Sequence, residues 1–200
     1  MARKIQISKE VILQAALEML IRDGFASVNI KTLSKEIGCS TQPLVWHFEN
    51  MDGLRKALAQ YALAYANTKM EPKDGNSIEA FKQVGTGFVR IALDEPNLFR
   101  FLYLEGYMGL PADNLEMLIN DEENIELIKR ISKDLEISKK KASRYLQNTI
   151  VYTYGIATLI AIGMIKTSQK EVMKLVNNAA NAFLIQEGVL LDELSSKKGK

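Results

Sequence analysis

The fold of this chain is decided by residues 29–54, NIKTLSKEIGCSTQPLVWHFENMDGL. Ile30, Leu33 and Ile37 repeat at the spacing of one buried helical face, so the stretch begins with a short amphipathic helix. Gly38 stands where this helix must stop, a position that suits a residue able to take positive φ. The spacing therefore predicts a helix followed at once by a tight turn.

A second, shorter helix follows the turn. Ser40 can cap it, and Pro43 falls in its first turn, where a missing N–H costs nothing. Leu44 and Phe48, four residues apart, give it one buried side and leave its other side exposed. Helix, tight turn and short second helix are the layout of a helix-turn-helix, whose second helix enters the DNA major groove.

The amino-terminal residues also match a known signature in residue type and spacing. The matching positions are Ile12, Leu13, Ala15, Ala16, Leu17, Gly24, Phe25, Ile30, Leu33, Gly38, Ser40, Leu44, His47, Phe48, Asn50, Asp52 and Leu54. Over residues 8–60 the chain thus resembles the TetR-type transcriptional regulators. It departs from them at Gln42, Val45 and Met51, where the family usually has Gly, Tyr and Lys. The Tyr and Lys commonly touch phosphates, and Gln42 replaces a residue that cannot read bases with one that can.

The resemblance implies an all-α fold with two domains. Residues 1–50 form a three-helix helix-turn-helix DNA-binding domain, and a fourth helix, 51–68, links it to an effector-binding and dimerisation domain, 51–190. Residues 191–200 form a polar tail. The family relation implies a homodimeric repressor that a small-molecule effector releases from a palindromic operator. The alternative is a helical adaptor whose helix-turn-helix binds a protein partner instead of DNA.

The candidate DNA-binding residues lie on the exposed sides of the two short helices. They are Lys31, Ser40, Thr41, Gln42, Pro43, Trp46, His47 and Asn50. Gln42 can bond the N6 and N7 atoms of adenine in a bidentate way, and Lys31 is a candidate for a phosphate contact. Large aromatics are usually buried, so Trp46 could instead be a core residue. Because Leu44 and Phe48 already define the inner face, we expect Trp46 to face DNA.

Residues 145–165 carry no charge over 21 positions, which is long enough for a membrane span. Polar residues within the stretch and a charged companion helix favour a buried helix instead. The family resemblance implies that the last two helices form a four-helix bundle with those of a second copy. We expect the small residues of this stretch and two positions of the last helix at the dimer interface: Gly155, Ala157, Ala161, Gly163, Leu175 and Ala179.

Large aromatic side chains between the linker at 71–75 and the last two helices are the candidates for the effector site. They are Phe88, Phe99, Tyr103 and Tyr107, joined by Tyr145 and Tyr152 from the neighbouring helix. Tyrosine hydroxyls could orient a bound molecule within an apolar pocket. No cluster of Arg or His points to a phosphate or a metal, so we expect a hydrophobic or amphipathic effector and no cofactor.

Composition is that of a soluble globular protein, with 47% apolar and 25% charged residues. A net charge of only +2 excludes a basic protein that coats DNA. A single cysteine excludes an intramolecular disulfide, and the first ten residues lack the apolar core of a secretory signal, so we expect a cytoplasmic location. The single histidine, His47, has no acid signature nearby, so we expect no enzymatic activity and no metal site.

Overall fold

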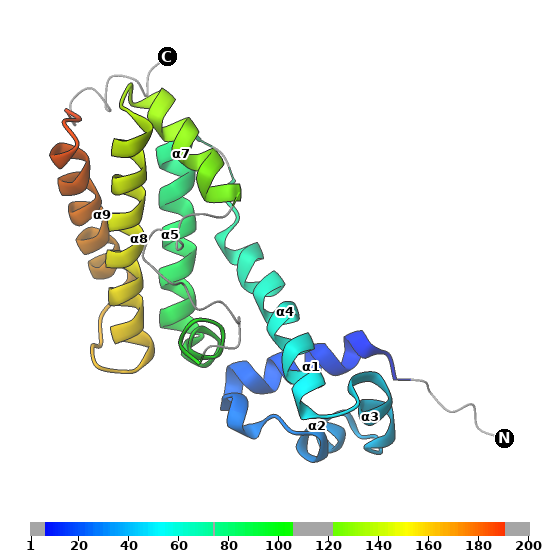
Figure 1. Ribbon diagram of the computed structural model, residues 1–200. Coiled ribbons are helices and arrows are strands. Elements are labelled where there is room, and N and C mark those ends of the chain that lie inside the picture. The colour runs from blue at the N-terminus through cyan, green and yellow to red at the C-terminus, as the bar shows by residue number, and fades with distance from the viewer. Residues whose placement is uncertain (1–6, 74, 106–121, 191–200) are drawn as a thin grey trace. The chain divides into compact units, whose positions relative to one another are not determined.

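The computed structural model describes residues 7–73, 75–105 and 122–190, and they are almost entirely helical (Figure 1). No strand occurs among them, which confirms the all-α prediction. The described residues form two compact units. Unit 1 contains residues 7–69 and 94–105, and unit 2 contains residues 70–93 and 122–190.

This division differs from the boundary expected at residue 50. The fourth helix packs with the amino-terminal helices, and residues 94–105 return to the same unit after an excursion into unit 2. The chain therefore passes between the units after Lys69 and again before Asp94. The fourth helix is consequently not the sole covalent connection between the two units.

Unit 1 consists of α1 (Lys9–Asp23), η1 (Phe25–Ser27), α2 (Ile30–Ile37), α3 (Gln42–Phe48), α4 (Met51–Met70), α6 (Pro96–Phe99) and a π-helical turn, η2 (Arg100–Leu104). Leu33 on α2 and Leu44 and Phe48 on α3 are buried as predicted, together with Ile12, Ala16, Met19 and Leu20 on α1. Leu98, Phe99, Phe101 and Leu102, which follow α5 in the sequence, complete this core. The packing that positions α3 thus depends on residues separated from it by about fifty positions of sequence.

The turn between α2 and α3 follows the local sequence closely. The Asn29 side chain accepts hydrogen bonds from the backbone N–H groups of Lys31 (3.1 Å) and Thr32 (3.0 Å), which begins α2. Gly38 ends α2 at φ +75°, as predicted. The expected Ser40 cap is wrong, because α3 begins at Gln42 after Thr41, whose φ of −71° and ψ of −15° are already helical. A side-chain cap needs an extended residue at that position.

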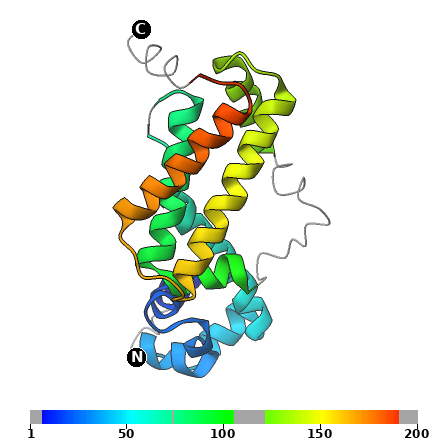
Figure 2. The same ribbon diagram turned by 90° about the vertical axis from the view of Figure 1, so that its left-hand side faces the viewer.

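Unit 2 consists of α5 (Ser77–Asp94), α7 (Glu122–Asp134), α8 (Lys139–Ala161) and α9 (Gln169–Gln186). Its core is the cluster Ile78, Phe81, Ile131, Ala142, Tyr145, Leu146, Ala180, Leu184 and Val189. Figure 2 shows α8 and α9 side by side, with α5 behind them. Ser138 and Ser168 cap α8 and α9. The uncharged stretch 145–165 runs past the end of α8 at Ala161.

Candidate DNA-binding surface

The short helix α3 has one buried and one exposed side. Leu44 is fully buried and Phe48 is 4% exposed, so both face the core of unit 1. On the other side Gln42 is exposed, Val45 is 45% exposed and Trp46 is 68% exposed. Trp46 is therefore not a core residue, and the outer side of α3 presents one amide and two apolar groups.

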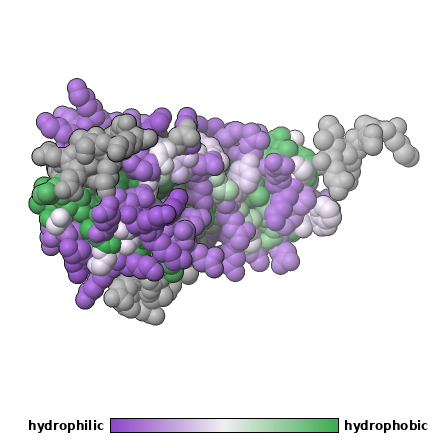
Figure 3. Space-filling view, turned by 90° about the horizontal axis from the view of Figure 1, so that it is seen from above, coloured by the Kyte–Doolittle hydropathy of each residue, from purple (hydrophilic) through white to green (hydrophobic). Residues whose placement is uncertain are grey.

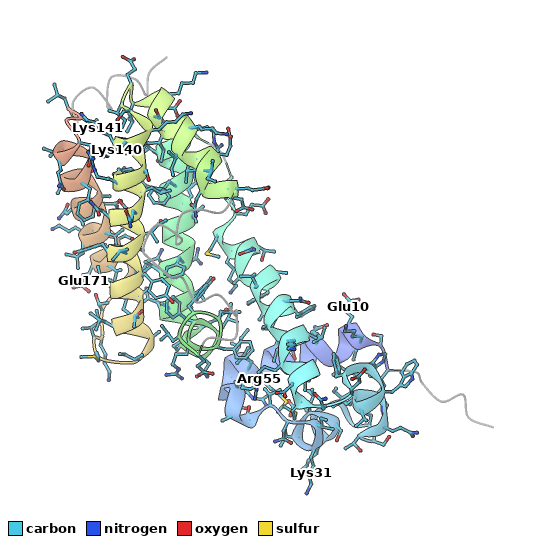
Figure 4. All side chains as sticks on the ribbon, viewed as in Figure 1. Glu10, Lys31, Arg55, Lys140, Lys141 and Glu171 are labelled. Carbon is cyan, nitrogen blue, oxygen red and sulfur yellow. The ribbon has the colours of Figure 1, made fainter. Side chains whose placement is uncertain are left out.

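The polar residues before α3 extend this exposed face. Ser40 and Thr41 are exposed beside Gln42, whereas Pro43 is half-buried. Lys31 extends from α2 away from the rest of unit 1 (Figure 4). Its ammonium group makes no ion pair with the residues that the structure describes. Lys31, Ser40 and Thr41 were predicted from the sequence as DNA contacts, and their side chains are exposed.

Another cation on the same unit is engaged within the protein. The Arg22 guanidinium lies 2.8 Å from the Asp23 carboxylate and 3.0 Å from that of Glu36. These hydrogen bonds raise the pKa of Arg22 above its usual range. Because its charge is balanced by two acids, Arg22 is a poorer phosphate ligand than Lys31.

His47 makes a hydrogen bond within the protein. Its Nε2 lies 3.0 Å from the main-chain oxygen of Ile7, forty residues earlier. A carbonyl oxygen only accepts, so Nε2 carries the proton and donates it. The half-buried ring therefore holds the residue that leads into α1, and this N–H is not offered to DNA. Sequence spacing gave no signal for this contact.

The corner between α3 and α4 is fixed by backbone geometry. The Asn50 side chain accepts hydrogen bonds from the N–H groups of Asp52 (2.9 Å) and Gly53 (3.0 Å), and so caps α4 as predicted. At Gly53 a Cβ atom would lie 2.1 Å from the main-chain oxygen of Phe48. Only glycine permits this close approach, which sets the direction in which α4 leaves the corner.

The residues predicted for an effector site are divided between the two units. Phe99 is fully buried in the core of unit 1, and its ring lies 5.1 Å from that of Tyr103. Phe88, Tyr145 and Tyr152 belong to unit 2. Tyr107 lies outside the described residues.

Within unit 2, Tyr145 is the most deeply buried of these candidates. Its side chain is fully buried and meets the Phe81 ring edge-on, with centroids 6.0 Å apart. Its hydroxyl has no hydrogen-bond partner among the described residues. The nearby Thr149 hydroxyl donates instead to the main-chain oxygen of Tyr145 at 2.8 Å. Burial raises the pKa of the Tyr145 hydroxyl to about 12.

The aromatic candidates at the sides of unit 2 are less enclosed. The half-buried Phe88 ring lies 5.7 Å from that of Tyr154, and the half-buried Tyr152 ring lies 6.2 Å from that of Phe183. The Phe88 and Tyr152 rings therefore each pack against another aromatic ring of unit 2.

The residues predicted for a dimer interface divide into two groups. Ala157 is fully buried and Ala161 is 2% exposed within a single copy, so they face the protomer's own interior and cannot contact a second chain. Gly155, Gly163 and Leu175 are exposed, and Ala179 is half-buried. The small-residue pattern did not distinguish the two sides of the helix.

An exposed apolar stripe runs along the outer sides of α8 and α9. Its residues are Val151, Tyr154, Leu159, Ile162, Leu175 and Ile185. Hydrophobic residues reach the surface along the edge that α9 forms, at the left of Figure 3. Sequence analysis missed most of this stripe because it considered only the small residues of α8.

In the part of the chain that the structure describes, no helix is both long enough and apolar enough to cross a membrane. Nor does it contain three or more His, Cys, Asp or Glu residues grouped as metal ligands.

The amino-terminal part of the chain is similar in sequence to known proteins. Residues 12–58 match the model of bacterial regulatory proteins of the tetR family. The class D tetracycline repressor protein of Escherichia coli is 30% identical over 76 residues, which cover 38% of this chain and 35% of that protein. The chain thus matches about a third of the length of this relative.

Solved structures extend the likeness to the fold of the whole chain. A TetR variant from Acinetobacter baumannii AYE in complex with minocycline has a TM-score of 0.58 at 20% identity, covering 90% of this chain and 96% of that one. BioQ with its natural double-stranded DNA operator has a TM-score of 0.52 at 18% identity, covering 88% and 98%. At such identities the likeness establishes the fold alone. The family match is confined to residues 12–58, and this segment of the chain is similar to the bacterial regulatory proteins of the tetR family.

Proposed function

We propose that this protein is a sequence-specific DNA-binding transcriptional regulator of the repressor type, whose helix α3 enters the major groove. The observation that carries the proposal is the exposed side of α3, with Gln42 and Trp46 directed away from the core, inside the segment that matches the family. A helix of this kind can read base edges only if its outer side chains are not used within the protein. Among the described residues the Gln42 side chain makes no hydrogen bond, and the Trp46 side chain is 68% exposed although its ring also contacts that of His47.

Contacts are divided between base reading and backbone positioning. Gln42 would bond adenine in the major groove, and Ser40 and Thr41 would reach phosphates or base edges beside it. Lys31 would bind a phosphate and so contribute affinity without sequence preference. His47 would act indirectly, since its hydrogen bond to Ile7 fixes where the chain enters α1.

The proposed active form is a homodimer joined through the outer sides of α8 and α9. The exposed apolar stripe supports this, because surface apolar area of this kind is favourable to bury against a second copy. Two symmetric α3 helices would then bind a palindrome whose half-sites lie about 34–36 Å apart. A footprint on an asymmetric single site, or saturation of the DNA by a monomer, would contradict this arrangement.

The proposed effector is a small hydrophobic or amphipathic molecule that binds unit 2. Tyr145 supports this, because a buried hydroxyl without a partner costs about 1–3 kcal/mol, which a polar group of a ligand could offset. Such a molecule weakens DNA binding only if it prefers a state in which the α3 helices are wrongly spaced. Reciprocity then requires operator DNA to lower the affinity for the effector by the same factor.

Selection from a pool of random duplexes with the full-length protein tests the proposal. We expect enrichment of a palindromic sequence and binding that weakens steeply with salt. Lys31→Ala should weaken binding to that sequence, whereas Lys140→Ala, which removes an exposed lysine of α8 (Figure 4), should not. If no sequence is enriched at low salt, α3 is not a DNA reader.

A further inference from the structure

The exposed side of α3 carries more apolar surface than polar recognition requires. Val45 and Trp46 are adjacent in sequence, 45% and 68% exposed, and both lie on the helix proposed to enter the groove. The major groove offers one apolar group at the edges of its bases, the C5-methyl group of thymine. An exposed aliphatic side chain on a reading helix therefore has one natural partner there.

The two apolar residues lie on different sides of the outer face. The Trp46 ring lies 4.8 Å from the His47 ring, on the side where His47 is tied to Ile7. Val45 lies on the side of Thr41 and Gln42, and its N–H donates to the Thr41 main-chain oxygen at 3.1 Å. Val45 thus neighbours both Thr41 and Gln42, four and three residues before it, whereas Trp46 neighbours Gln42 and Pro43.

The spacing of Gln42 and Val45 sets where they meet DNA. Side chains three residues apart on a helix have Cβ atoms about 5–6 Å apart. Base pairs are stacked at about 3.4 Å, so this separation corresponds to between one and two base-pair steps. Valine is also stiff at χ1, so little side-chain entropy is lost when it is fixed against a methyl group.

We propose that Val45 is a specificity-determining residue that recognises thymine through its 5-methyl group, one or two base pairs from the adenine that Gln42 reads. The inference rests on the proposed function, because it requires α3 to occupy the major groove. It assigns a role in base recognition to the position at which the related regulators usually carry the phosphate-binding tyrosine.

The experiment uses the best duplex from the selection and the full-length protein. Each thymine is replaced in turn by uracil, which removes the methyl group and leaves base pairing unchanged. At one thymine in each half-site we expect uracil to weaken binding about fourfold, the equivalent of one buried CH₂ group. Val45→Ala should bind the same duplex with little or no difference between thymine and uracil at that position.

Two variants serve as controls. Val11→Ala removes a valine of similar exposure, 49%, from α1, and it should keep the uracil penalty. Trp46→Phe should keep it as well, because the ring at 46 is not the group that contacts the methyl. Since Val45 is exposed, its replacement should leave the fold intact, which thermal unfolding of each variant checks.

The outcomes separate this inference from the proposed function. If the wild-type protein selects no sequence, the DNA-binding function itself fails. If a sequence is selected and uracil is neutral at every position, the function stands and the role of Val45 is wrong. The role is also wrong if Val45→Ala retains the uracil penalty, or if Trp46→Phe abolishes it.

Discussion

The Asn97 side-chain amide donates a hydrogen bond to the main-chain oxygen of Ile21 at 3.0 Å, across 76 residues of sequence. Ile21 lies in the last turn of α1, where main-chain oxygens have no partner within the helix. Arg100 donates in turn to the Asn97 oxygen and holds the amide in place. The end of α1 is therefore capped by a residue that follows α5.

Replacing Asn97 tests whether this contact stabilises the DNA-binding unit. Asn97→Ala removes a partly buried hydrogen bond, so we expect the free energy of unfolding to fall by about 1 kcal/mol. Chemical denaturation monitored by circular dichroism measures the change. Asn178→Ala removes an exposed asparagine of α9 and should cost less than about 0.5 kcal/mol. Equal losses in the two variants would show that the contact with α1 is not the cause.

Gln42 and Lys31 should affect DNA binding in different ways. Gln42→Ala removes a bidentate base contact, so we expect a loss of about 1–3 kcal/mol on the best site and relaxed preference at one base pair. Lys31→Ala should weaken binding to all sequences alike and reduce the slope of log K against log salt by about one. Titrations at several salt concentrations and a repeated selection measure both effects. An unchanged selected sequence for Gln42→Ala would remove Gln42 from the readers.

Gly53 should not tolerate even one added carbon atom. In Gly53→Ala the new Cβ would lie 2.1 Å from the Phe48 oxygen, so the corner between α3 and α4 must shift. We expect a loss of about 2 kcal/mol or more in stability, together with weaker DNA binding. Gly85→Ala is the matched control, because its Cβ meets nothing within 4 Å and alanine is the better helix former. Thermal unfolding should show opposite shifts for the two variants.

The exposed stripe on α8 and α9 should be essential for the dimer. Leu159 is 38% exposed in a single copy, and Leu159→Glu would place an unpaired charge in the proposed interface. We expect a monomer in analytical ultracentrifugation and loss of operator binding, although unit 1 is unchanged. Ile125→Glu puts the same charge on α7, at a residue that is 42% exposed, and should remain dimeric. An intact dimer in Leu159→Glu would locate the interface elsewhere.

The buried Tyr145 hydroxyl should lower the free energy of unfolding and contribute to effector binding. Because its hydroxyl has no partner among the described residues, Tyr145→Phe should raise the free energy of unfolding by about 1–3 kcal/mol when no effector is bound. The raised pKa means that the folded state resists ionisation of this tyrosine. The wild-type protein should therefore lose stability as the pH rises from about 10 towards 12, and Tyr145→Phe should lose less.

Denaturation curves at pH 8 and pH 11 separate these effects. Tyr152→Phe is the control, since Tyr152 is only half-buried. If Tyr145→Phe is destabilising at pH 8, the hydroxyl has a partner, and the argument that it serves an effector loses its basis.

The sequence by itself determined the helix-turn-helix and the limits of its first helix. Asn29 and Gly38 act on backbone groups within a few residues, and the stripes ending in Leu44 and Phe48 repeat with the helical period. Such signals involve residues that are close together in the chain, so they can be recognised from the sequence without the tertiary structure. The identity of α3 and the exposure of Gln42 could therefore be predicted.

Tertiary structure alone decided which partners distant residues meet. His47 donates to Ile7, Asn97 to Ile21, and Phe99 fills the core of unit 1 and not an effector site. Tertiary structure also decided which side of α8 is buried. This apolar helix carries small residues on several sides, so its sequence does not show which side faces the core. Periodicity shows that a face is apolar, but burial depends on what packs against it. That is set by the path of the whole chain, and here it placed Ala161 inside and Leu159 outside.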